Sequence, residues 1–296
     1  MPSRPIDESL VRDLLIDQHA DLAGLPISPA TSGWDNAVFR LGDRLSVRLP
    51  RRLEAVPLIA HEQRWLPELE AHLPLPIPVP LRVGVEGCGY PWPWSVCPWL
   101  PGEPASGTPP VDPRQTARRL GAFIGALHQP APPDAPVNPH RGTPLARRAV
   151  RFHEALESVG RSTRRLPDAR VDQIRTRWEE LVSTPAHTEA PVWLHGDLHP
   201  ANLLVHRGEL CAVIDFGDVT SGDPATDLAV GWMLLDGPSR VELRRAVGTV
   251  DDDTWRRAEA WALALALAYL DGSPDGSPMV DVALRTLAAV LDEPLR

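Results

Sequence analysis

Residues 195–202 and 214–218 contain carboxylates and an amide at a spacing that could serve phosphoryl transfer. The first stretch reads His-Gly-Asp-Leu-His-Pro-Ala-Asn, and the second reads Ile-Asp-Phe-Gly-Asp. Metal-dependent phosphoryl transfer needs one carboxylate to orient or deprotonate the attacking hydroxyl, and hard oxygen ligands to hold Mg²⁺ against the nucleotide phosphates. Asp197 suits the first role. Asn202 and Asp215 suit the second.

A purely structural interpretation makes residues 195–197 a polar turn and Asp215 the polar end of a strand. That interpretation has to treat the residue types and the spacing of Asp197, Asn202 and Asp215 as independent coincidences. Because motif matches carry weight only together with their spacing and context, we favour the active-site interpretation.

The N-terminal part of the chain predicts one helix followed by a small antiparallel sheet. Apolar residues at helical spacing predict the helix over residues 7–22. Alternating apolar residues and intervening turn signals then predict strands near residues 27–32, 36–41 and 44–49.

The sequence contains no lysine, so at a phosphoryl-transfer site an arginine has to supply the cation that binds the phosphates. Arg48 lies in the third predicted strand, and Glu62 lies in the helix predicted over residues 55–66. A guanidinium can bind phosphate through two parallel hydrogen bonds, although its planar shape differs from an ammonium group. We expect Arg48 to bind phosphates and Glu62 to hold it. A solvated strand-end role for Arg48 stays open.

The rest of the chain predicts two further strands and then a mainly helical part. Residues 81–85 and 94–99 have the strand pattern, and proline residues between 73 and 80 impose an extended connection before them. Helices are predicted after Gly102, over residues 113–128, 144–159, 168–182, 225–235, 239–247, 254–270 and 280–291.

Composition limits the classes of partner and compartment. The 296-residue chain has 30 basic and 39 acidic residues, and its net charge of -9 disfavours nucleic acid and is compatible with a cationic small substrate. The three cysteines, Cys88, Cys97 and Cys211, have no paired or metal-binding spacing, which favours a reducing compartment. No apolar run reaches the length of a membrane span. We therefore expect a cytoplasmic protein without a membrane or nucleic-acid partner.

The spacing of residues 195–202 and 214–218 resembles the H-R-D-x-x-x-x-N and D-F-G motifs of the protein-kinase fold. Gly196 replaces the arginine of that motif, and His199 stands where protein kinases usually have lysine. These two features resemble the aminoglycoside phosphotransferase family. The resemblance implies an α+β, protein-kinase-like fold of two lobes. A small antiparallel-sheet N-lobe would cover residues 1–101, and a larger, mainly helical C-lobe would cover residues 102–296.

The N-lobe has a second resemblance, to the macrolide phosphotransferases. Arg48-Leu-Pro-Arg-Arg resembles their Arg-x-Pro-Arg-Arg, and Gly33-Trp-Asp resembles their Gly-x-Asp. The resemblance implies that Ser32, Gly33 and Asn36 belong to a loop that covers the nucleotide phosphates. An ordinary hairpin is the alternative for this loop, because it has one glycine and lacks the full glycine-rich motif.

In the same families the segment between the lobes binds the edge of the nucleotide base. The resemblance implies that Pro98 offers its carbonyl, since proline has no N–H, and that Leu100 offers its N–H. It also implies that Asp227 braces the catalytic loop and that His195 supports that loop without taking part in the chemistry.

The implied reaction is transfer of the γ-phosphoryl group of ATP or GTP, with Mg²⁺, to a hydroxyl of an aminoglycoside- or macrolide-like acceptor, as in antibiotic resistance. A kinase of a sugar, choline or another amino alcohol is an alternative. A catalytically inactive nucleotide-binding scaffold is an alternative of another class. A protein kinase is disfavoured because residues 217–223 leave no room for a long activation segment and no A-P-E follows.

Overall fold

The computed structural model describes residues 4–30, 33, 35–162 and 166–292. The chain forms two compact units. The first contains the residues up to Pro101 together with Val213–Gly217, and the second contains Gly102–Ala212 and the chain from Asp218 onward. The short segment Val213–Gly217, which carries Asp215, therefore belongs to the first unit, although the rest of its neighbourhood in the sequence belongs to the second.

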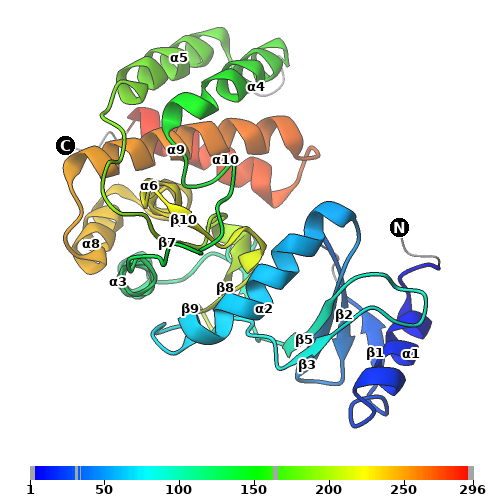
Figure 1. Ribbon diagram of the computed structural model, residues 1–296. Coiled ribbons are helices and arrows are strands. Elements are labelled where there is room, and N and C mark those ends of the chain that lie inside the picture. Colours follow the sequence, from blue (N-terminus) through cyan, green and yellow to red (C-terminus); the bar gives the residue numbers. More distant parts are fainter. Residues whose placement is uncertain (1–3, 31–32, 34, 163–165, 293–296) are drawn as a thin grey trace. The chain divides into compact units, whose positions relative to one another are not determined.

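The first unit is built on a five-stranded antiparallel sheet (Figure 1). In spatial order its strands are β1 (Ile27–Pro29), β2 (Asn36–Leu41), β3 (Leu45–Pro50), β5 (Trp94–Pro98) and β4 (Arg82–Gly84). The central strand β3 places Arg48 opposite Val38 on one side and opposite Ser95 on the other. The phosphate-binding candidate thus lies in the middle of the sheet.

The helix α1 (Glu8–Gln18) packs against this sheet and closes the core of the first unit. It begins at Asp7, whose carboxylate accepts a hydrogen bond of 2.9 Å from the Leu10 N–H. The helix predicted over residues 7–22 is too long, because the chain leaves the helix after Gln18 and makes turns instead. One of them is closed by the Leu22 N–H, which donates to the His19 carbonyl.

The helix α2 (Val56–Glu70) follows a short 3₁₀ turn (Leu53–Ala55) and positions Glu62. The buried residues of α2 recur at helical spacing and form one face of the helix, with Ile59, Glu62, Trp65 and Leu66. A carboxylate on an otherwise apolar buried face needs a cation or donors to compensate its lost hydration. The position of Glu62 therefore indicates a buried charged partner.

The second unit is mainly helical (Figure 1). Its helices are α3 (Pro113–Leu127), α4 (Ala149–Arg161), α5 (Asp168–Val182), α6 (Ala225–Leu228), α7 (Val230–Leu234), α8 (Gly237–Val247), α9 (Asp252–Gly272) and α10 (Pro278–Asp292). The apolar helix α9 lies at its centre, in contact with α4, α5, α6, α7 and α10. The prediction of a single helix over residues 225–235 is wrong in one respect, because the helix is divided at Ala229 into α6 and α7.

Among the described residues, five short strands complete this part of the chain. The strand β7 (Val192–Leu194) pairs with β10 (Thr220–Gly222), and β6 (Glu103–Pro104) pairs with β8 (Leu203–His206), which neighbours β9 (Glu209–Val213). Residues 195–202 connect β7 to β8. The catalytic candidate Asp197 is thus held between two strand pairs.

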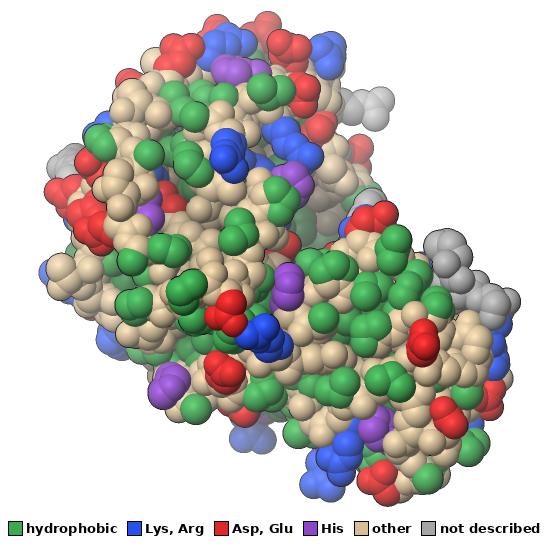
Figure 2. Space-filling model, in the orientation of Figure 1, with side chains coloured by type: hydrophobic (Ala, Val, Ile, Leu, Met, Phe, Trp, Pro, Cys, Tyr) green, Lys and Arg blue, Asp and Glu red, His purple; other side chains and the backbone are tan. Residues whose placement is uncertain are grey.

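The surface carries charges of both signs. On the face that Figure 2 shows, basic and acidic side chains both occur among apolar and other polar ones. Within the described part of the chain, no helix has the length and hydropathy of a membrane span.

Candidate active site

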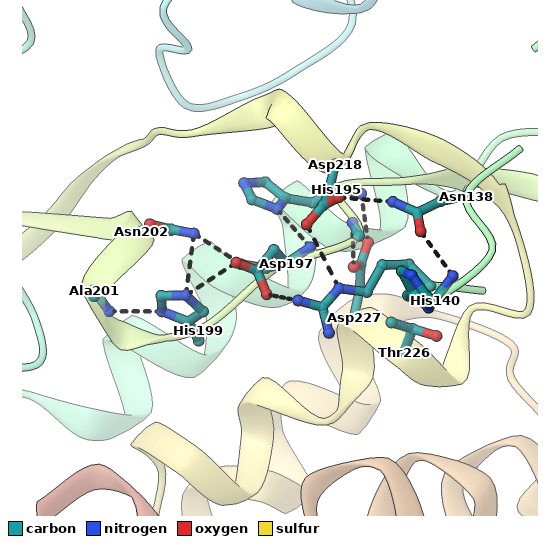
Figure 3. A network of polar contacts seen from close by, with 12 residues as sticks. Asn138, His140, His195, Asp197, His199, Ala201, Asn202, Asp218, Thr226 and Asp227 are labelled. Carbon is teal, nitrogen blue, oxygen red and sulfur yellow. Dashed lines mark hydrogen bonds and ion pairs between the residues drawn. The ribbon is translucent and has the colours of Figure 1, made fainter. Parts of the chain in front are cut away.

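The loop that carries Asp197 is anchored by the buried carboxylate of Asp227. Its two oxygens accept hydrogen bonds from the His195 N–H at 2.8 Å and from the Gly196 N–H at 2.9 Å (Figure 3). The Nε2 atom of His128 lies 3.3 Å from the same carboxylate. The prediction that Asp227 braces this loop is confirmed.

Gly196 has a conformation that other residues rarely adopt. Its φ is +85°, and a Cβ at this position would lie 2.2 Å from the carbonyl oxygen of Asp218. The pairing of β7 with β10 causes this close approach. Only glycine fits here without moving the backbone, which explains why this chain lacks the arginine that protein kinases carry in the motif.

Asp197 has a partner at each of its carboxylate oxygens. Oδ1 lies 2.5 Å from Nη2 of Arg141, and Oδ2 lies 3.3 Å from Nε2 of His199. Its N–H donates to Nδ1 of the fully buried His195 at 3.2 Å, so His195 supports the loop as predicted. The side chain of Asp197 is 25% exposed, which leaves it accessible to an acceptor.

The surroundings of Asp197 keep it ionised. Burial by itself raises the pKa of a carboxyl group, but the charges of Arg141 and His199 outweigh burial and hold the pKa of Asp197 well below its usual range. A carboxylate of such low basicity is suited to accept a hydrogen bond from an acceptor hydroxyl and to orient its oxygen.

Arg141 is the functional residue that sequence reasoning missed. It lies in the proline-rich segment between α3 and α4, where the sequence predicts neither a helix nor a strand. Its Nε also lies 3.6 Å from Oδ2 of Asp218, whose Oδ1 accepts a hydrogen bond of 2.7 Å from Asn138. The only local signal is the following Gly142, which has a φ of +62° and at which a Cβ would lie 2.7 Å from Leu194.

Asn202 is oriented so that its oxygen is available. Its Nδ2 donates to the Asp197 carbonyl at 2.9 Å and lies 3.3 Å from Nε2 of His199. Its Oδ1 accepts no hydrogen bond from the described residues and points away from Asp197 in Figure 3. A fixed amide oxygen of this kind fits the hard ligand set of Mg²⁺.

Asp215 belongs to the first unit and has an unusual backbone conformation. Its φ is +64°, which is uncommon for a residue other than glycine and is concentrated at functional sites. Its side chain is 55% exposed, and Oδ1 lies 3.5 Å from Nη2 of Arg48. This accessible carboxylate also fits the oxygen ligands of Mg²⁺.

The expected contact between Arg48 and Glu62 is present. Nη1 of Arg48 donates to Oε1 of Glu62 at 3.0 Å, and both side chains are buried. Burial lowers the pKa of a guanidinium, but the carboxylates of Glu62 and Asp215 outweigh burial and raise the pKa of Arg48. Arg48 is therefore a fixed cation, and its role toward phosphates stays a prediction.

The predicted phosphate-covering loop is only partly described. Ser32 lies outside the described residues. Gly33 is exposed, and a Cβ at this position would have no neighbour within 4 Å. Asn36 is buried at the start of β2, and its Oδ1 has no hydrogen-bond partner in the described part of the chain. The nucleotide-binding role of this loop stays a prediction.

The predicted base-binding segment ends the strand β5. Pro98 is its last residue and lies opposite Leu45, and the next N–H, of Trp99, donates to the Arg44 carbonyl at 2.8 Å. Leu100 makes no hydrogen bond with another described residue, so its N–H is available as a donor.

Among the described residues, no group of three His, Cys, Asp or Glu side chains could hold a metal by itself.

The sequence matches the model of the phosphotransferase enzyme family over residues 26–261. Because the match covers most of the chain, the protein belongs to this family and is a phosphotransferase. The match confirms the family that the motifs indicated, and it confirms the prediction that the protein is a phosphotransferase. A search of curated proteins found no match.

Solved structures of phosphotransferases share the fold. The GDP complex of wild-type aminoglycoside 2'-phosphotransferase-IIIa superposes with a TM-score of 0.72 at 19% identity, over 98% of this chain and 100% of that chain. The apoenzyme of a macrolide 2'-phosphotransferase from Brachybacterium faecium has a TM-score of 0.61 at 23% identity, over 99% and 100% of the two chains. These likenesses confirm the predicted α+β, two-lobed fold.

Proposed function

We propose that this phosphotransferase transfers the γ-phosphoryl group of ATP or GTP to a hydroxyl of an aminoglycoside- or macrolide-like small molecule. The observation that carries the proposal is the ionised and accessible carboxylate of Asp197, fixed by Arg141 and His199 on a loop that Asp227 anchors. In this role Asp197 accepts the hydrogen bond of the acceptor hydroxyl and directs its oxygen toward the phosphoryl group.

The remaining residues bind the nucleotide. Asn202 and Asp215 are the proposed ligands of Mg²⁺, which when bound neutralises charge on the phosphates. Arg48, fixed by Glu62, binds phosphate oxygens. The turn with Ser32, Gly33 and Asn36 covers the phosphates, and Pro98 and Leu100 bind the edge of the base.

Related proteins support the acceptor class. One aminoglycoside phosphotransferase of the same fold was solved with GDP and kanamycin, at 20% identity and a TM-score of 0.71. Another was solved with ADP, at a TM-score of 0.59.

Resistance to an antibiotic is the biological role that such an activity would have. The three cysteines are all free, which supports a cytoplasmic location.

A phosphorylation screen tests the proposal. Purified protein is incubated with Mg²⁺ and either ATP or GTP, and with aminoglycosides, macrolides, sugars and amino alcohols in turn, and products are detected by the added phosphate mass. Asp197→Asn serves as the matched control, since it keeps the shape of the side chain and removes its charge. We expect a phosphorylated acceptor with the wild type and a severe loss with the variant. Mg²⁺-dependent nucleotide binding without any phosphorylated product would instead favour the inactive scaffold.

A further inference from the structure

The backbone on either side of Arg141 is fixed by two buried threonine hydroxyls. Before Arg141, the Asn138 N–H donates to the hydroxyl of Thr220 at 2.9 Å. After Arg141, the Gly142 N–H donates to the hydroxyl of Thr226 at 3.1 Å. Because both flanks of Arg141 are held in this way, only the direction of its side chain remains to be set.

Two carboxylates set the direction of the Arg141 side chain. Nη2 lies 2.5 Å from Oδ1 of Asp197, and Nε lies 3.6 Å from Oδ2 of Asp218. The two contacts use different nitrogens of one planar group, so together they restrict both the position and the plane of the guanidinium. Asp218 therefore limits how Arg141 can meet Asp197.

Asp218 is itself oriented by Asn138 (Figure 3). Nδ2 of Asn138 donates to Oδ1 of Asp218 at 2.7 Å, and Oδ1 of Asn138 accepts from the His140 N–H at 2.8 Å. Because a backbone N–H holds the amide oxygen, the amide nitrogen is left to face the carboxylate. One oxygen of Asp218 thus faces Asn138, and the other faces Arg141.

The charges of this group depend on one another. Burial raises the pKa of Asp218 and the charge of Asp197 acts in the same direction, whereas Arg141 and Asn138 lower it. The side chain of Arg141 is only 17% exposed, and Asp197 and Asp218 both compensate the burial of its charge. Two carboxylates therefore keep the guanidinium in a largely buried position, and removal of one of them should let it move.

We propose that Asp218 is a positioning residue for the activation of the acceptor hydroxyl. Asp218, oriented by Asn138, fixes the guanidinium of Arg141, and Arg141 in turn fixes the carboxylate of Asp197 that receives the hydroxyl. Asp218 does not contact the acceptor in this role. The proposal rests on the function proposed above, and it adds a residue to which the motif spacing assigned no role. A misplaced catalytic group slows turnover because the reacting atoms have to be aligned.

Asp218→Asn tests the proposal, because it keeps the shape of the side chain and removes its charge. The new amide can still accept from Asn138, but it then turns its NH2 group toward Nε of Arg141. We expect kcat to fall by about tenfold, as for the loss of a hydrogen bond to a charged group. KM for the acceptor and the affinity for nucleotide should stay within about twofold. A raised KM with an unchanged kcat would instead mean that Asp218 binds the acceptor directly, and it would overturn the proposal.

Asp218→Glu separates the charge of the side chain from its packing. This variant restores the carboxylate but changes the shape, and it should recover part of the loss in kcat. If Asp218 only filled space, Asp218→Asn would be the better substitute. A higher kcat for the Asn variant than for the Glu variant would therefore overturn the proposal.

Glu209→Gln is the matched control. Glu209 is an exposed carboxylate of the same unit, and it also pairs with an arginine, Arg119, at 2.8 Å. This variant should keep the wild-type kcat. A loss equal to that of Asp218→Asn would show a general effect of removing a negative charge, and it would overturn the proposal.

The coupling of Asp218 with Arg141 is measured in a double-mutant cycle. Because Asp218 acts through Arg141, Asp218→Asn should lower kcat little further in a protein that already carries Arg141→Gln. Two losses that multiply in the combined variant would show that Asp218 acts independently of Arg141, and they would overturn the proposal.

The melting temperatures of the same variants distinguish failure of this proposal from failure of the proposed function, because they need no acceptor. The combined variant should lose less than the sum of the two single deficits, since residues in contact are not additive. Coupled melting temperatures without turnover of any acceptor would count against the proposed function and leave the fixed guanidinium standing. Turnover with losses in kcat that multiply would overturn the role of Asp218 and leave the proposed function standing.

Discussion

Each unit of the molecule contains an arginine that lies between two carboxylates. The two units differ in how exposed these carboxylates are. In the first unit, Arg48 joins the buried Glu62 at 3.0 Å to the exposed Asp215 at 3.5 Å. In the second unit, Arg141 joins Asp197 at 2.5 Å to Asp218 at 3.6 Å, and both carboxylates are partly exposed.

The difference indicates opposite roles for the two arginines. Glu62 is 1% exposed and cannot meet a substrate, so in the first unit a carboxylate fixes the cation for which we propose the functional role. In the second unit Asp197 is the accessible group, and the cation fixes the carboxylate. We therefore expect substitutions of Arg48 and Glu62 to affect the nucleotide, and substitutions of Asp197 and Arg141 to affect the acceptor.

The largest effect should come from Asp197→Ala, which removes the functional carboxylate of the second unit. Loss of a general base costs about 10²–10⁴-fold in turnover, whereas nucleotide affinity should stay within about twofold because Asp197 acts on the acceptor. Steady-state kinetics and calorimetry measure the two properties. A kcat close to that of the wild type would remove Asp197 from the mechanism.

The next effect should come from Asp215→Ala in the first unit. As a metal ligand, Asp215 should contribute on the order of 10²-fold to kcat, the usual cost of losing one electrostatic contact to the transferring group. Nucleotide binding should weaken more with Mg²⁺ than with EDTA. Calorimetry that gave equal losses under both conditions would show that Asp215 does not bind the ion.

Arg48→Ala and Glu62→Ala should each lower kcat/KM for the nucleotide by about 10–100-fold, since a hydrogen bond to a charged group is worth about 1.5–3 kcal/mol. The double variant should lose little more than the worse single variant, because coupled residues are not additive. Arg48→Lys should recover part of the loss by restoring the charge. Arg82→Ala is the control, because Arg82 is an exposed arginine of the same sheet. Additive losses would place the phosphates elsewhere.

The smallest effect should come from Arg141→Gln, at about tenfold in kcat/KM for the acceptor, and it should depend on pH. In the wild type the pKa of Asp197 lies below its usual range, so Asp197 stays ionised and should give no acid limb above about pH 4. Without Arg141, burial is opposed only by His199 and His195, so that pKa should rise and the acid limb should move to higher pH. The pH–rate profile measures this change.

The stability of the wild type and of Arg141→Gln should also depend on pH, because the same pKa of Asp197 is shifted. A depressed pKa of Asp197 contributes stability above the pKa of the unfolded chain, and this contribution is lost as the pH falls through the folded value. The deficit of Arg141→Gln in melting temperature should therefore be largest near neutral pH and shrink in acid. A deficit independent of pH would mean that Arg141 only packs against its neighbours.

The sequence by itself determined the elements and the main candidate residues. The helical pattern placed Glu62 in the helix predicted over residues 55–66, alternation placed Arg48 in a strand, and the motif spacing identified Asp197, Asn202 and Asp215. These features depend on neighbours a few residues apart, because side-chain direction repeats every 3.6 residues in a helix and every second residue in a strand. The end of α1 and the division at Ala229 were not predicted, since helix ends depend on local capping and packing.

Only the tertiary structure decided which charges meet. Arg141 lies far from Asp197 in the sequence, in a segment without periodicity, and the proline-rich loop brings it into contact. The need for glycine at position 196 follows from the approach of the Asp218 carbonyl across the pairing of β7 with β10. Arg148 lies in the helix predicted over residues 144–159, and only folding buries its side chain against Trp261. Burial and long-range contact set the charge state of such groups, and neither property is encoded in local sequence pattern.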